Sequence, residues 1–210
     1  MKKKLLSILL CLVMVVGSLP TAAFAAGSVE INETNFPDAK FRSFVKENLD
    51  KNKDNILDAG EIAAVKKIEA NNMGIKSLEG VGFFTALETL KCWDNELTGL
   101  DLSKNTKLTS LSCSENELTA LDVSKNKKLE ELDCESDSLL SYMKLTKLDV
   151  SQNKALKKLN CYGVKMKELN VSGCTALERL DCGGNQLIAL DVSNNPKLKD
   201  LSCGDMLPIE

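Results

Sequence analysis

Residues 50 to 61 carry oxygen-bearing side chains at the spacing that proteins use to wrap a calcium ion. Side-chain oxygens fall at positions 1, 3, 5, 9 and 12 of this segment, and position 7 would offer a backbone carbonyl. The six candidate ligands are Asp50, Asn52, Asp54, Ile56, Asp58 and Glu61. Because a hard cation prefers several oxygen ligands, we predict one bound calcium ion per chain.

The order of these residues is that of an EF-hand loop, with one departure. Position 8 is apolar (Leu57), and apolar residues spaced around the loop predict flanking helices over about 37–49 and 60–67. Asn55 stands at position 6, where glycine is usual, but asparagine also adopts left-handed backbone, so we expect a weakened site. A single loop in an exported protein indicates weak affinity, with a dissociation constant of about 10⁻⁴ M. The alternative is a solvated acidic turn between two short helices.

Other chemistry is excluded by composition. The 210 residues include no histidine, which removes every mechanism that needs an imidazole base or ligand. No asymmetric group of catalytic residues occurs, so we expect no enzyme. Without Lys2, Lys3 and Lys4 of the leader described next, 24 basic side chains face 30 acidic ones, a net charge of −6. Nucleic acid is therefore a disfavoured partner.

Residues 1–25 have the pattern of a secretory signal. A basic start is followed by an apolar run from Leu5 to Val16 and by the small-residue cleavage pattern of Ala23 to Ala25. The apolar run is shorter than the roughly 20 residues that a spanning helix needs. We therefore predict cleavage after Ala25 and export without a membrane span.

From Leu87 onward the unit Leu-x-x-Leu-x-Cys-x-x-Asn-x-Leu recurs. Its cysteines, at positions 92, 113, 134, 161, 182 and 203, are 21 residues apart except for one interval of 27. Coils start near 65, 87, 108, 129, 156, 177 and 198, and the six extra residues fall at about 140–147 as an outward loop. One such unit cannot bury its apolar side alone, so the units must stack.

The predicted fold is therefore an α/β repeat solenoid: parallel-strand leucine-rich-repeat coils over 65–210, preceded by a small helical cap at 26–64. Period-two alternation predicts a strand at Leu90 to Cys92, and Leu100 to Leu102 could add a second set of strands. We expect the asparagines at 95, 116 and 185 to bond backbone groups at the bends. The aspartates two residues before each serine, as in Asp101 and Ser103, should close turns.

Seven cysteines remain after the leader is removed. Export favours disulfides, but side chains on parallel strands about 4.8 Å apart diverge too far for a relaxed bridge. Spacings of 21 match no zinc pattern. We therefore expect small buried core residues with free thiols.

The outward positions beside the cysteines are the candidate ligand-binding residues. They are Lys91, Trp93, Asp133, Glu135 and Tyr162. Aromatic side chains on an outward strand face are suitable anchors for a protein or glycan partner. The alternative is that Trp93 and Tyr162 only cover neighbouring side chains. Glycines at 183, 184 and 204 predict a flat carboxy-terminal end, so we expect a binding patch within coils 87–162.

These coils resemble the nested 21-residue leucine-rich repeats of secreted bacterial proteins, loosely related to the internalins. The phrase Leu-Asp-Val-Ser-x-Asn at 121–126 and 190–195 carries the resemblance. The segment 31–42 with the acidic loop is similar to the caps of the same family, principally from Gram-positive anaerobes.

The resemblance is specific for the fold and not for the function, since such solenoids serve adhesion, ligand capture and scaffolding alike. We predict a secreted or cell-surface monomer that binds an extracellular protein or glycan. Because the first coil of a solenoid exposes its core end, we expect the calcium loop to stabilise a cap over that coil. The alternative is a non-binding structural segment, or the truncated front part of a longer surface adhesin.

Overall fold

The computed structural model describes residues 27–136 and 143–204. The predicted leader (1–25) lies outside the described residues, as does part of the predicted insertion (140–147).

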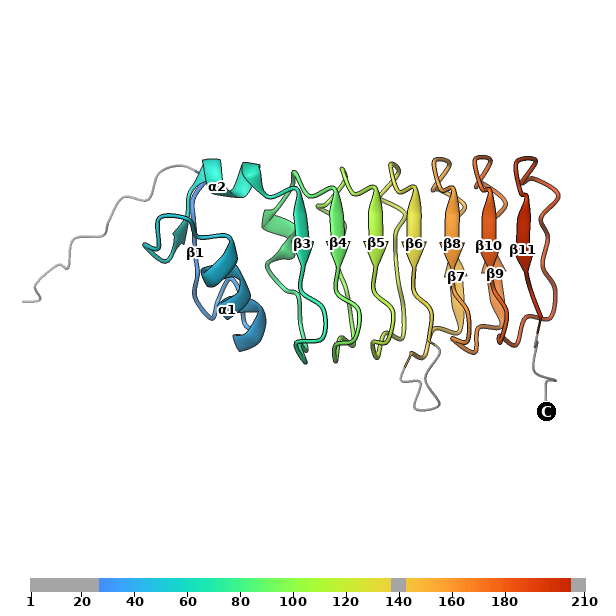
Figure 1. Ribbon diagram of the computed structural model, residues 1–210, viewed down its shortest axis with the longest axis horizontal. Coiled ribbons are helices and arrows are strands. Elements are labelled where there is room, and N and C mark those ends of the chain that lie inside the picture. Colours follow the sequence, from blue (N-terminus) through green and yellow to red (C-terminus); the bar gives the residue numbers. More distant parts are fainter. Residues whose placement is uncertain (1–26, 137–142, 205–210) are drawn as a thin grey trace, which may run out of the picture.

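Seven parallel strands of three residues each lie side by side in one sheet of the described chain (Figure 1). The strands are β3 (Lys67–Glu69), β4 (Thr89–Lys91), β5 (Ser110–Ser112), β6 (Glu131–Asp133), β8 (Lys158–Asn160), β10 (Arg179–Asp181) and β11 (Asp200–Ser202). Each coil pairs in register with the next, so that Leu90 faces Leu111. The predicted leucine-rich-repeat solenoid is confirmed.

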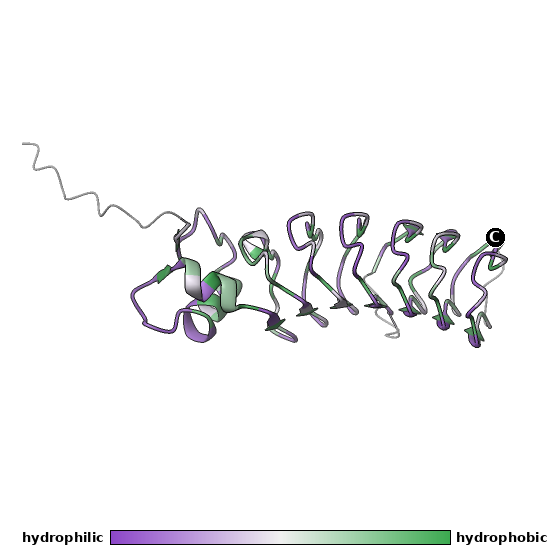
Figure 2. Cartoon of the chain, turned by 90° about the horizontal axis from the view of Figure 1, so that it is seen from above, coloured by the Kyte–Doolittle hydropathy of each residue, from purple (hydrophilic) through white to green (hydrophobic). Residues whose placement is uncertain are grey.

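The core runs the length of the solenoid because each coil turns its leucines inward. Figure 2 shows the coils edge-on, with the strands along one long edge of the stack. Leu90, Leu111, Leu132, Leu159 and Leu180 are all at most 2% exposed. A single three-residue strand buries too little apolar area to be stable, so the stacking of neighbouring coils stabilises the fold.

Asparagine side chains hold the bends, as predicted. Asn116 Nδ2 donates to the carbonyls of Cys92, Cys113 and Ser114, and its Oδ1 accepts from the amide of Leu97. Asn95 and Asn185 repeat this arrangement. Since buried backbone groups are costly when unpaired, one asparagine satisfies several of them in each bend.

A second set of strands forms only in part of the solenoid. β7 (Lys147–Asp149) pairs in parallel with β9 (Glu168–Asn170). The other described coils have no strand at the corresponding place, Leu100 to Leu102 among them. The predicted turns are present in both kinds of coil, because the Ser103 amide donates to Asp101 and the Ser151 amide to Asp149. That bond therefore does not determine whether a strand forms.

The cap comprises β1 (Val29–Glu30), α1 (Ala39–Asn48), β2 (Ile56–Leu57) and α2 (Ala59–Ala64). It lies at one end of the row of strands (Figure 1). The helix predicted to reach residue 67 is shorter than expected. The backbone becomes extended at Val65, and Ile68 enters the core as the centre of β3, paired with Leu90.

Aromatic rings join the cap to the first coil. Phe36 is fully buried, 5.9 Å from the ring of Phe41 in α1 and 6.4 Å from that of Phe84. Gly80 precedes the short 3-10 helix η1 (Val81–Phe83), and a Cβ there would collide with Asn35 and Phe36. The close approach of cap and coil therefore requires glycine at this position.

Among the residues that the structure describes, no helix has both the length and the apolar character needed to cross a membrane.

Candidate calcium loop and ligand-binding face

The loop at 50–61 is shaped by its own short strand. β2 occupies loop positions 7 and 8 and pairs antiparallel with β1, so that Leu57 faces Val29. The Ile31 amide extends this pairing by donating to the Asn55 carbonyl at 2.9 Å. Asn55 has a φ of 66°, the left-handed backbone expected at position 6.

Amides of the loop donate hydrogen bonds to its acidic side chains. Asp50 is only 2% exposed, and its two oxygens accept from the amides of Lys53 and Asn55 at 2.7 and 2.9 Å. Asn52 accepts from the amide of Asp54, and Asp54 from that of Ile56. A nearly buried carboxylate with only amide partners fits a site that also receives a cation, because burial without a counter-charge is unfavourable.

Glu61 connects the two ends of the loop. Its Oε1 accepts from the amide of Lys51 at 2.7 Å, and its Oε2 accepts from that of Asp58 at 3.0 Å. Asp58 in turn accepts from the Glu61 amide, which completes a capping box at the start of α2. The last candidate ligand is thus placed beside the first turn of the loop.

The oxygen-only donor set and the backbone of the loop suit calcium. Within residues 27–136 and 143–204, however, no three acidic or thiol side chains converge closely enough to hold a metal ion. The six predicted ligands lie along one loop, and the four carboxylates among them accept hydrogen bonds from its amides.

The outward face of the seven-stranded sheet carries the other candidate residues. Trp93 follows β4 and is 40% exposed, so part of its indole is open to solvent. Lys91 is the last residue of β4 and forms an ion pair with Glu69 at 3.0 Å. Asp133 accepts from the Ser114 hydroxyl at 2.9 Å, and Glu135 accepts from the Asn160 amide group at 2.6 Å.

Tyr162 covers the next coil. A Cβ at Gly183 would lie 3.2 Å from Cδ2 of the Tyr162 ring, and one at Gly184 would lie 3.2 Å from its Cζ. The glycines therefore give room to this ring. This half-buried position supports the covering role that the sequence left open for Tyr162, whereas Trp93 remains exposed.

The carboxy-terminal part of the face is hollowed, which differs from the flat end that the glycines predicted. A groove of about 690 Å³ crosses β6, β8, β10 and β11, with Asp133, Asn160 and Asp181 among its lining residues. The glycines follow the strands and do not belong to this lining. The sequence signal for this groove is the charged first residue of each of the four strands, Glu131, Lys158, Arg179 and Asp200.

The buried cysteines form an inert column. All seven described cysteines are free, and six are buried; Cys203, beyond β11, is exposed. Burial raises the pKa of Cys92 to about 12, and it also raises the pKa of Cys113. A thiol that stays protonated is neither a nucleophile nor a metal ligand.

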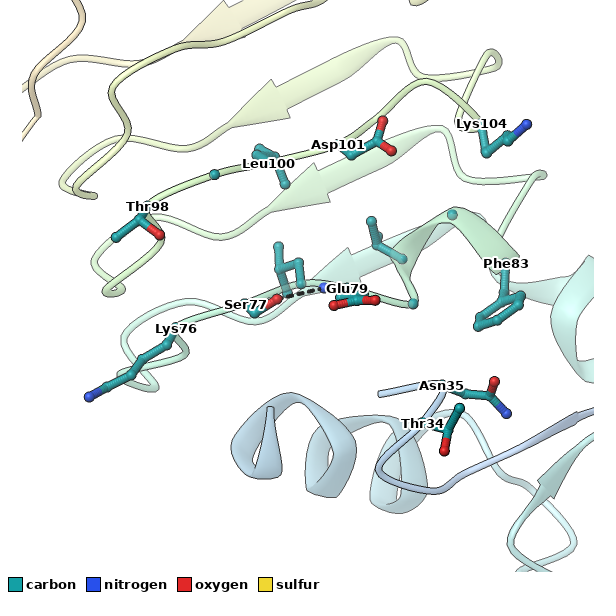
Figure 3. Close-up of a pocket in the computed structure, with 15 residues that line it drawn as sticks. Thr34, Asn35, Lys76, Ser77, Glu79, Phe83, Thr98, Leu100, Asp101 and Lys104 are labelled. Atoms are coloured by element: carbon teal, nitrogen blue, oxygen red, sulfur yellow. Dashed lines mark hydrogen bonds between the residues drawn. The ribbon is translucent and has the colours of Figure 1, made fainter. Parts of the chain in front are cut away.

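A further hollow, of about 800 Å³, lies between the cap and the first coils. Phe83 points toward the cap, where Asn35 lies, and Leu100 lines the hollow from the next coil (Figure 3). Lys76 and Lys104 extend at opposite ends of it. No motif in the sequence indicated this hollow, because it depends on how the cap is seated.

Solved structures similar to this chain are leucine-rich-repeat proteins. The functional domain of InlJ from Listeria monocytogenes, described as including a cysteine ladder, is 33% identical over 84% of this chain, with a TM-score of 0.62. Internalin C2 from the same organism is 25% identical over 87% of this chain and 80% of its own, with a TM-score of 0.69.

The Leptospira interrogans protein LIC12759 shares the fold at 21% identity and a TM-score of 0.51, over 76% of this chain and 45% of its own. This chain spans 42% of the InlJ chain, so it matches less than half of that protein's length. No protein-family model and no curated protein matches the sequence.

Proposed function

We propose that the chain is an exported leucine-rich-repeat binding protein whose cap is stabilised by one calcium ion. The observation that carries the binding role is the exposure of Trp93 on the strand face. An exposed indole on a strand face is suited to contact with a partner, because aromatic side chains supply much of the energy of recognition.

The fold supports binding over catalysis. A stacked sheet presents a long, rigid row of outward side chains, and the inward thiols beneath it are held protonated. The partner that this proposal envisages is an extracellular protein or glycan. Export rests on the leader at 1–25, and a secreted or cell-surface location follows from it.

The calcium proposal rests on the loop at 50–61. Asp50, Asn52, Asp54, Asp58 and Glu61 would hold the ion through side-chain oxygens, and Ile56 through its carbonyl. The bound ion would supply positive charge among carboxylates that otherwise repel one another. Because β2 of this loop pairs with β1, ordering the loop also fixes the amino-terminal strand of the cap.

A stabilised cap would protect the first coil. The amino-terminal end of a solenoid exposes core side chains unless a polar unit covers them. Here Phe36 and Phe41 cover that end and are fully buried. A calcium ion bound by residues 50–61 would therefore stabilise the folded cap. It would leave the strand face free for a partner.

The binding role is tested with the mature chain, residues 26–210, on arrays of glycans and extracellular proteins. Trp93→Ala should abolish any specific signal while the melting temperature changes by less than about 2 °C, since removing an exposed side chain costs little. Ile188→Ala, which removes another exposed apolar side chain (75% exposed), is the matched control. Equal signals from the Trp93 variant and the unaltered chain would refute a binding site at this face.

A further inference from the structure

We infer that the strand face binds a cationic polypeptide segment, whose arginine or lysine side chains lie between Trp93 and Tyr162. This inference rests on the proposed binding function and specifies the partner's chemistry. It comes from a difference between the two halves of the face, which we call the entry half and the exit half. The entry half holds the first side chain of each strand and the one before it, and the exit half holds the last side chain of each strand and the one two residues beyond.

Charges in the entry half are paired from coil to coil. Lysines and arginines there face carboxylates on the neighbouring coil at 2.5 to 3.4 Å. The pairs are Lys66–Glu88, Lys157–Glu130, Lys158–Glu131, Arg179–Asp200 and Lys199–Glu178. Such a row neutralises itself and offers no net charge to a partner.

Apart from Glu69, the carboxylates in the exit half have neutral partners. Asp133 accepts from the Ser114 hydroxyl, Glu135 from the Asn160 side chain, and Asp181 from the Gly183 amide. None of the three forms an ion pair with another described residue. Lys91 is the one cation at the end of a described strand, and Glu69 already neutralises it. The exit half therefore carries net negative charge.

Trp93 and Tyr162 flank two of these carboxylates along the sheet, Asp133 and Glu135, whereas Asp181 lies one strand beyond Tyr162. Trp93 follows β4 and Tyr162 follows β8, three strands further along the sheet, which is roughly 14 Å at the usual strand spacing. Asp133 and Glu135 belong to the coil of β6, between the two rings. Asp133 and Asp181 also line the groove of the face.

Arginine and lysine fit this arrangement better than a neutral ligand does. A guanidinium group stacks on an aromatic face and pairs with a carboxylate in the same plane, and an ammonium group can use both kinds of contact. A neutral sugar would stack on the rings, but it has no positive charge to pair with the carboxylates.

The test uses a dye-labelled octapeptide of alternating arginine and glycine, with a glutamate–glycine octapeptide as the comparison. Fluorescence anisotropy measures binding to the mature chain at 50 mM NaCl, and emission of Trp93, the only tryptophan, reports the location. We expect the arginine peptide to bind and to change this emission. We also expect the affinity to fall at 300 mM NaCl, because exposed charges are screened.

The decisive variants change the net charge equally. Asp133→Asn with Glu135→Gln should weaken binding at least about fivefold, the loss expected on removing favourable contacts of about 1 kcal/mol. Glu47→Gln with Glu168→Gln removes the same two charges at exposed positions outside the strand face, on α1 and β9, and should change affinity less than twofold. Equal weakening by both pairs would show attraction to overall charge and overturn the inference.

Failure of the inference differs from failure of the proposed function. If the arginine peptide does not bind, but a glycan or an uncharged protein surface binds in a Trp93-dependent way, the face is a binding site and the inferred cationic partner is wrong. If no ligand depends on Trp93, both are overturned.

Discussion

The carboxylate of Asp38 joins the cap to the solenoid, because its Oδ2 accepts a hydrogen bond from the backbone amide of Lys76 at 2.8 Å. Its Oδ1 accepts from the amides of Lys40 and Phe41, so the same side chain also caps α1. Lys40 adds a second contact by donating from Nζ to the Gly74 carbonyl at 3.0 Å. Asp38 therefore bonds both the first helix and the first coil, and Lys40 adds a second link between them.

Replacing Asp38 by asparagine should separate these two roles. Asparagine is an equally good helix cap, but its Nδ2 would face the Lys76 amide, so two donors would oppose each other. We expect Asp38→Asn to destabilise the protein by about 1 kcal/mol, measured by urea unfolding. An unchanged midpoint would show that the junction does not depend on this bond.

The same variant predicts a pH dependence. Burial alone would raise the pKa of Asp38, but hydrogen bonds from the amides of Phe41, Lys76 and Lys40 outweigh it and hold the pKa below its usual value. The stability from Asp38 is therefore complete above about pH 4, the unfolded value, and is lost as the pH falls through the lower folded-state pKa. The difference between Asp38→Asn and the unaltered chain should shrink across this acid range.

Gly80 gives a prediction about the fit of the cap. It has a φ of 98°, and a Cβ there would collide with the Asn35 carbonyl and the Phe36 ring. We expect Gly80→Ala to destabilise the protein by at least about 2 kcal/mol in urea unfolding. Gly99 has open space around it, so Gly99→Ala is the matched control and should be near neutral.

Asn116 tests the asparagine bends. Asn116→Asp preserves the shape of the side chain but removes the Nδ2 donor that three carbonyls share. Because buried carbonyls then lack a partner and a charge is buried, we expect a loss of at least about 2 kcal/mol near pH 7. The exposed Asn194→Asp makes the same chemical change and should have little effect. Similar melting curves for the two variants would rule out the structural role of the bend.

The repeated residues were the predictable part of the fold. A leucine, cysteine or asparagine that recurs every 21 residues has one structural role, which explains why the coils, the buried thiols and the bends were foreseen. Val65 and Ile68 show the limit. Their spacing suits a helix as well as a coil, and pairing of Ile68 with Leu90 makes this segment a strand.

The candidate sites were less predictable because they depend on contacts between coils. The order of residues 50–61 indicated a loop, and Asn55 has the expected left-handed backbone. The pairing of the loop strand β2 with Val29 and Glu30 could not be read from the sequence, since two-residue strands carry no periodic signal. Likewise, the charge difference on the strand face depends on which side chains meet across neighbouring coils.

Thiol reactivity follows from burial. In the folded mature chain at pH 8, we expect one fast-reacting cysteine per chain, the exposed Cys203, in a colorimetric thiol assay. The six buried thiols should react only after unfolding, because burial holds them protonated, as the raised pKa of Cys182, about 11, illustrates. Cys203→Ser should remove the fast phase. Several fast thiols would contradict the closed core.

A calorimetric calcium titration of residues 26–210, with a parallel thermal melt in chelator, tests the central claim most directly. We predict about one ion per chain and a higher melting temperature with calcium, since binding to the folded state alone stabilises it. Glu61→Gln should weaken both effects, whereas Glu47→Gln, an equal charge change on the exposed side of α1, should not. Absence of binding heat together with an unchanged melt would contradict the calcium-stabilised cap and leave residues 50–61 as an acidic turn.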